Sequence, residues 1–181
     1  MRFADFLRTA VLISAAAASA LAAVTLAGAV GGGDDLVVPV AAGWWVIAGA
    51  FGLWLGRRAE TSPPIASLLA SARTQSSLPE VNPSRTVLNR LWPLLVSTVG
   101  AGALGVILPQ VPAIAAGFAI IWSLAWRRQA SAVTAIEERD GARFYVAQTS
   151  PLRPIRLVRT PGFRTNLREL NGSAAARSLR P

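Results

Sequence analysis

The chain has no cysteine and no histidine, and all 18 of its basic residues are arginine. Without cysteine it can form no disulfide, thiolate nucleophile or zinc–thiolate site. Without histidine it lacks the commonest general base and the commonest transition-metal ligand. Without lysine it can carry neither a Schiff-base lysine nor a P-loop lysine. Because no other catalytic, metal-binding or cofactor motif stands out, we expect a protein that is not an enzyme and holds no metal or cofactor.

Charged residues are also scarce. They make up 15% of the 181 residues, against about a quarter in soluble domains, whereas 52% are hydrophobic. The apolar residues come in long blocks rather than at periodic positions, which indicates that lipid is the solvent for much of the chain. Arginine in place of lysine, with abundant alanine, is typical of GC-rich coding. It suggests a bacterial protein, and so an integral protein of the inner or plasma membrane.

The first long apolar run covers residues 9–30 and contains no charge. At the helical rise per residue a helix of this length spans about 33 Å, enough to cross the hydrocarbon core. A cleavable signal peptide is the alternative, because Arg2 and Arg8 precede the run and the Ala-Leu-Ala sequence at 20–22 resembles a cleavage site. The run is longer than a typical signal-peptide core, which favours a retained transmembrane helix.

A second uncharged run covers residues 36–55, and a Gly-Gly-Gly-Asp-Asp sequence at 31–35 separates it from the first. Glycines suit a tight turn there, and an aspartate can cap the helix that follows. The first two runs are therefore predicted to form a helical hairpin.

Two shorter apolar runs follow, over residues 91–108 and 111–126, joined by a Pro-Gln-Val-Pro reversal at 109–112. The last would be only about 24 Å long as a helix, against a hydrocarbon core of about 30 Å. The pair therefore either spans the membrane twice or forms a re-entrant hairpin, although Trp92 and Trp126 lie where interfacial anchors belong.

After the fourth run the composition becomes polar. Asp140 and Gly141 precede the alternating residues 142–146 and are typical of a β-hairpin turn, since this dipeptide tolerates positive φ. Residues 154–160 are a further candidate strand, which the Pro-Gly pair at 161–162 would end. We expect a two- or three-stranded β element next to the membrane.

These patterns predict an all-α membrane protein with four transmembrane helices in two hairpins and a small cytoplasmic C-terminal β element. Its organisation would be a transmembrane region at 1–128, which includes a loop at 56–90, then a β-rich tail at 129–163 and a disordered tail at 164–181. The disorder is expected because the residues of the last segment are small and polar.

The arginines separate by segment. They lie before the first run, between the second and third runs, and after the fourth, and the other two connections hold none. Positive residues stay on the side from which insertion occurs, so we expect the N-terminus, the 56–90 loop and the C-terminal tail in the cytoplasm. Four spans, or two spans with a re-entrant pair, keep this separation, whereas an odd number of spans does not.

One face of a short helix in the loop is apolar, formed by Ile65, Leu68, Leu69 and Ala72. Two interpretations stay open: the helix lies in the headgroup layer, or this face packs on the tail domain. Both use the same residues, and the spacing alone does not separate them.

Two sets of residues are candidates for contacts. Gly52 and Gly56 have the GxxxG spacing that lets helices approach closely, and Ala101 and Gly105 repeat this spacing with small residues. Near an anionic leaflet each arginine contributes about 1 kcal/mol of attraction, so the basic residues beside the spans and in the tail are predicted to contact anionic lipid headgroups or a partner. These residues are Arg57, Arg58, Arg127, Arg128, Arg153, Arg156 and Arg159.

The favoured function is a non-enzymatic scaffold or accessory subunit in the lipid bilayer, whose cytoplasmic tail contacts anionic lipid or a membrane-protein partner, or which assembles as a homo-oligomer. A small transporter or channel subunit is the alternative, although coupled carriers usually place an ionisable residue in the membrane and these runs hold none. A membrane enzyme would use Glu137, Glu138 and Asp140, for which solvation on a turn is the ordinary explanation. Nucleic acid is not an expected partner, because the tail has few aromatic residues for stacking.

Overall fold

The computed structural model describes residues 1–32, 36–57, 61–74, 83–147 and 155–161. These residues are mostly helical, with three short strands. The elements in chain order are α1 (Phe3–Gly32), α2 (Val37–Leu55), α3 (Pro63–Ala70), β1 (Arg73–Thr74), α4 (Pro83–Leu104), α5 (Gln110–Trp126), α6 (Gln129–Asp140), β2 (Ala142–Val146) and β3 (Leu157–Pro161). The tail predicted to be disordered, at 164–181, lies outside the described residues.

Three of the described helices are long and apolar enough to cross a membrane: Phe3–Gly32, Val37–Leu55 and Ser84–Leu104. They coincide with the first three apolar runs, because an unbroken run of apolar residues is what a lipid-exposed helix requires. The fourth run forms α5, which has 17 residues. Its length of about 26 Å falls a little short of a hydrocarbon core of about 30 Å.

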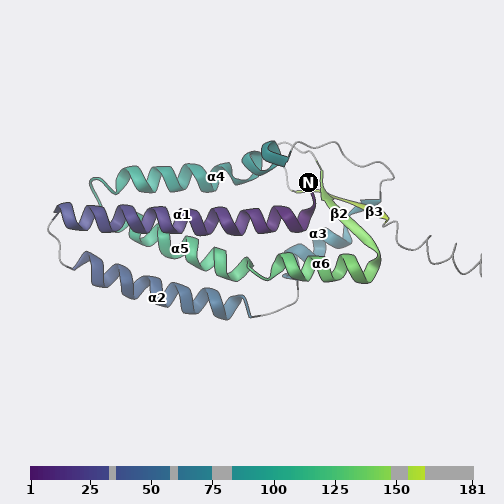
Figure 1. Cartoon of the computed structure of the whole chain (residues 1–181), viewed down its shortest axis with the longest axis horizontal. Coiled ribbons are helices and arrows are strands. Elements are labelled where there is room, and N and C mark those ends of the chain that lie inside the picture. The colour runs from purple at the N-terminus through teal and green to yellow at the C-terminus, as the bar shows by residue number, and fades with distance from the viewer. Residues whose placement is uncertain (33–35, 58–60, 75–82, 148–154, 162–181) are drawn as a thin grey trace, which may run out of the picture.

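The long helices lie side by side, with α5 between α1 and α2, and α4 against α1 on the other side (Figure 1). Helices α1 and α2 follow each other in the chain, yet each contacts α5 far more than the other. The helices of the first predicted hairpin are therefore held together mainly through a helix from the second half of the chain.

Small side chains on α5 allow this central position. Ala116 and Gly117 are buried, and the indole of Trp44 lies so close to Gly117 that a Cβ atom there would overlap it. The Nε1 of Trp45 donates a hydrogen bond to the Ala113 carbonyl oxygen at 2.9 Å. Helices that associate in lipid gain little from the hydrophobic effect. Close approach of their backbones and hydrogen bonds such as this indole–carbonyl bond are then the main sources of attraction between them.

Contacts at the two ends of the bundle fix the direction of its helices. A Cβ atom on Gly28, near the end of α1, would lie 3.3 Å from the Gly105 carbonyl oxygen and 3.3 Å from Pro109 Cβ. The α4–α5 connection therefore lies at the end of the bundle where α1 finishes. At the opposite end, Gly56 follows α2 and lies against the carbonyl of Leu124 in α5.

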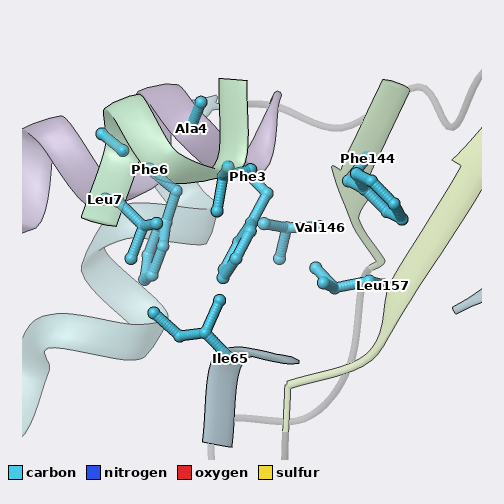
Figure 2. Packing of buried hydrophobic residues seen from close by; sticks show 10 residues of the cluster. Phe3, Ala4, Phe6, Leu7, Ile65, Phe144, Val146 and Leu157 are labelled. Atoms are coloured by element: carbon cyan, nitrogen blue, oxygen red, sulfur yellow. The ribbon is translucent and has the colours of Figure 1, made fainter. Parts of the chain in front are cut away.

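The hydrophobic core lies beyond that second end, in a small domain. It is formed by the first turns of α1, by α3 and α6, and by β2 and β3, and we call it the end domain (Figure 2). At 30 residues α1 is about 45 Å long, more than the length needed to cross a hydrocarbon core, and its first turns belong to this domain. The buried core residues are Phe3, Ala4, Phe6, Leu7, Ile65, Ala130, Val133, Phe144, Val146 and Leu157.

The sheet of the end domain has the strand order β1-β3-β2. Strand β3 pairs antiparallel with β2 and parallel with β1. On the other edge of β2, Arg2 forms an isolated bridge with Tyr145, and the Val146 amide donates to the Met1 carbonyl oxygen at 3.1 Å. Segments from the start, the middle and the end of the chain thus meet in one sheet.

The hairpin predicted at Asp140 and Gly141 is wrong. Residues Gln129–Asp140 form α6, and Gly141 ends this helix in the left-handed conformation, with φ of 59°. Gly141 meets the same requirement for positive φ in both readings, because glycine is favoured at a helix C-terminus as well as in a hairpin turn. The strands predicted around 142–146 and 154–160 are confirmed as β2 and β3, which pair with each other.

Helix α3 uses its apolar face inside the end domain. Ile65 is 2% exposed, and Leu68, Leu69 and Ala72 pack against the core. The interpretation that this face lies in the headgroup layer is therefore wrong, and the interpretation that it packs on the tail domain is confirmed.

Candidate functional site: the arginine-rich end of the bundle

The arginines of the described residues all lie at the end of the bundle that carries the end domain. Those in α1 and α4 fall in the N-terminal turns of these helices, and α2 and α5 are followed by arginine at their C-terminal ends (Figure 1). The others belong to the end domain itself. The described members are Arg2, Arg8, Arg57, Arg73, Arg85, Arg90, Arg127, Arg128, Arg139, Arg143, Arg156 and Arg159.

Three exposed arginines directly follow the helices of the bundle. Arg57 follows α2, and Arg127 and Arg128 follow α5. The Nη1 of Arg128 donates to the Arg57 carbonyl oxygen at 3.1 Å, which holds these two helix ends together. A cation at a helix C-terminus is also favoured by the helix dipole. We call these three residues the proximal arginines.

Tryptophans lie beside the proximal arginines. Trp54 is exposed in the last turn of α2, and the rings of Trp122 and Trp126 near the end of α5 meet at a tilt of 39°, with 5.3 Å between their centroids. Indole rings concentrate at the level of the lipid headgroups. The combination of indoles followed by guanidinium groups is therefore the pattern expected at a membrane–water boundary.

A second group of exposed arginines lies farther out. Arg139, Arg143 and Arg159 are on α6, β2 and β3, and we call them the distal arginines. Helix α6 continues from α5 away from the bundle for 12 residues, or about 18 Å. The headgroup layer on each side of a bilayer is only about 5–8 Å thick. When the bundle stands upright in a membrane, the far end of α6 therefore lies beyond the headgroup layer (Figure 1).

The predicted contact residues thus occupy two levels. Arg57, Arg127 and Arg128 are proximal, and Arg159 is distal. Arg156 is exposed next to β3, where its carbonyl oxygen accepts from the Ala147 amide at 2.9 Å. The two remaining predicted residues, Arg58 and Arg153, lie outside the described residues.

One acidic side chain is buried and was not anticipated. Glu137 Oε2 accepts from Arg2 Nη2 at 2.8 Å, and Glu137 Oε1 accepts from the Phe144 amide at 2.9 Å. The Glu137 side chain is 3% exposed and that of Arg2 is 39% exposed. The hydrogen bond to Glu137 raises the pKa of Arg2 above its ordinary value. This carboxylate joins the start of the chain to α6 and β2.

The other two acids of this region are exposed. Glu138 faces solvent, and Asp140 forms an ion pair with Arg139 at 2.8 Å on the surface. The hydrogen bond from Arg139 lowers the pKa of Asp140. The three acids therefore do not converge, and among the described residues no three acidic side chains are grouped as metal ligands.

The glycines predicted to mediate helix packing on α2 face α5. A Cβ atom on Gly52 would lie 2.9 Å from Leu124 Cβ and 3.1 Å from Ile121 Cα. Gly56, one turn later, lies against the carbonyl of Leu124. Both positions bring the α2 backbone directly onto α5.

The two small residues predicted at the end of α4 lie near the α4–α5 connection. A Cβ atom on Gly105 would lie 2.8 Å from Pro112 Cγ and 2.9 Å from Val24 Cγ1, so this glycine lies between α1 and α5. Ala101 is half-buried, and its carbonyl oxygen accepts from the Gly105 amide at 3.1 Å. Gly105 is thus the member of the pair that contacts other helices.

No protein-family model, curated protein or solved structure matches the chain.

Proposed function

We propose that the protein is a non-enzymatic scaffold or accessory subunit of the plasma membrane, which crosses the bilayer four times and presents the end domain in the cytoplasm. The observation that carries this proposal is the convergence of three chain segments and all the described arginines at one end of the bundle. Positive residues stay on the cytoplasmic side during insertion, so this end is the cytoplasmic one.

The position of α5 supports four crossings over a re-entrant hairpin. Helix α5 packs along both α1 and α2, and its two ends lie at the two ends of the bundle, beside Gly28 and Gly56. A re-entrant segment would turn back within the apolar layer, which requires backbone that is buried in protein at that depth. The modest shortfall in the length of α5 can be met by local thinning of the bilayer.

Burial at the start of the chain supports a first helix that is retained. Phe3, Phe6 and Leu7 belong to the end-domain core (Figure 2), and Arg2 is paired with Glu137. Cleavage near 20–22 would remove all these contacts and expose the core that they cover. The signal-peptide alternative is therefore disfavoured.

Hydroxyl groups in the bundle favour a scaffold over a transporter. Thr25 is buried and donates to the Leu21 carbonyl oxygen at 2.9 Å. The exposed Ser97 similarly donates to the carbonyl oxygen of Leu94, in its own helix, at 2.9 Å. Such local bonds satisfy the donors within one helix, so these groups do not require a polar pathway between helices.

The lipid contact is tested with two matched triple variants of the full chain. One replaces the proximal arginines with glutamine and the other replaces the distal arginines, so that each loses three charges. Native mass spectrometry after extraction from membranes of mixed lipid should find anionic lipid on the wild-type protein and on the distal variant, and much less on the proximal variant. Equal retention by the two variants would contradict the contact.

A further inference from the structure

The end domain contains a groove on the side of the sheet that α3 and α6 cover. Its volume is about 310 Å³, and its walls come from α3, α6, β2 and β3. The residues that decide its chemistry are Thr61, Leu69, Arg139, Asp140, Phe144 and Arg159. The volume is at the lower end of the range for small-molecule pockets.

The groove has an excess of positive charge. Arg139 is paired with Asp140 at 2.8 Å, and the positive charge of Arg159 also contributes to the lowered pKa of Asp140. One carboxylate therefore faces two guanidinium groups. Within the described part of the chain, the exposed guanidinium of Arg159 forms no hydrogen bond or ion pair of its own. It is available to a carboxylate, which guanidinium groups bind with two parallel hydrogen bonds.

The groove also has apolar lining residues. Ala66 and Leu69 line it from α3, and Phe144 lines it from β2. Phe144 itself is 2% exposed, so the floor of the groove belongs to the end-domain core. A ligand that fits this site combines an acidic group with apolar side chains next to it.

The distance from the membrane excludes a lipid headgroup as the natural occupant. Arg139 and Asp140 are at the far end of α6, about 18 Å beyond α5. This exceeds the thickness of the headgroup layer and a Debye length of about 8 Å at physiological salt. The occupant must therefore come from the aqueous phase.

We propose that this groove is the docking site for an acidic segment of a water-soluble partner protein, in which carboxylates alternate with apolar side chains. The proposal rests on the proposed function, since it names the partner chemistry of the same end domain. Arg159 binds a carboxylate of the segment, and Ala66 and Leu69 of α3 contact its apolar side chains.

The test uses the full chain in nanodiscs of neutral lipid and a fluorescein-labelled decapeptide of alternating glutamate and leucine. Fluorescence anisotropy should detect binding to the wild-type protein. Arg159→Ser should weaken it by about tenfold, the equivalent of one charge-assisted hydrogen bond. Arg143→Ser is the matched control: Arg143 precedes Phe144 on β2 and points to the opposite face of the sheet, so its loss should change the affinity by about twofold at most.

Three results would overturn the proposal: no binding to the wild-type protein, equal weakening by the two substitutions, or displacement of the peptide by anionic vesicles. Because the nanodiscs contain no anionic lipid, failure of the lipid contact leaves this measurement unaffected. Retention of anionic lipid without peptide binding would reject the groove and keep the proposed lipid contact.

Discussion

Arg2 and Glu137 form a 2.8 Å ion pair although 135 positions separate them in the chain. The pair lies where the first turn of α1 meets α6 and β2, and the same carboxylate binds the Phe144 amide. The start of the first helix is thereby tied to residues that follow the last helix of the bundle. The end domain can therefore be completed only after both the start of α1 and the residues that follow α5 have been synthesised.

The first prediction concerns this pair. Glu137→Ala leaves Arg2 without its partner and the buried Phe144 amide without its acceptor, which should lower the free energy of unfolding by about 2–4 kcal/mol. Asp140→Ala is the control: it removes a carboxylate with a 2.8 Å ion pair, but on the surface, and should leave stability unchanged. Thermal unfolding in nanodiscs measures both. A similar loss in the two variants would refute the role of the buried pair.

A second prediction is that the first helix is retained in the mature protein. Its first turns supply Phe3, Phe6 and Leu7 to the core, so a processed chain could not form the end domain. The mass of the intact protein purified from membranes should include residues 1–22. A mass that lacks them would show that a peptidase removes the segment.

Helix packing provides a third prediction. Gly117→Ala places a Cβ atom on the Trp44 indole, and overpacking of this kind costs about 1–3 kcal/mol. Gly43→Ala, on α2, is the matched control, because a Cβ atom there would have nothing within 4 Å. Heating in detergent should unfold the Gly117 variant at a lower temperature than the control. If both variants unfold at the same temperature as the wild-type protein, the close α2–α5 contact is absent.

The role of α3 gives a fourth prediction. Ile65 is 2% exposed in the core, so Ile65→Ala should destabilise the end domain by about 2–4 kcal/mol. Ser67 is exposed on the other side of α3, where its hydroxyl donates to the Pro64 carbonyl oxygen, and Ser67→Ala should have little effect. Protease sensitivity of the end domain in nanodiscs reports the difference. An Ile65 variant as resistant as the Ser67 variant would argue against packing of α3 on the sheet.

The helices of the bundle could be predicted from the sequence because a helix exposed to lipid requires an unbroken run of apolar residues, as in residues 9–30 and 36–55. The end domain could be predicted only in part: strands β2 and β3 were expected, but β1 and the bridge formed by Arg2 come from distant segments that are too short to show a strand pattern. Pairing of this kind depends on tertiary contacts rather than on local preference.

The wrong hairpin prediction also explains why the burial of Glu137 was not predicted. Glu137 lies four positions after Val133 and seven after Ala130, both buried, and therefore on the inner face of α6. This spacing indicates burial only if the segment is recognised as a helix. The Asp-Gly sequence at 140–141 pointed to a strand and turn instead, so all three acids were assigned to solvent.

The central claim is that α4 and α5 both cross the membrane, with every arginine on one side. Because the chain has no cysteine, a single introduced cysteine can be labelled without background. Val106, in the α4–α5 connection, is 87% exposed, and Arg143 lies in the end domain. In intact cells a membrane-impermeant maleimide should label Val106→Cys at once and Arg143→Cys only after permeabilisation. Labelling of Val106→Cys only after permeabilisation, or from neither side, would contradict the four-span topology.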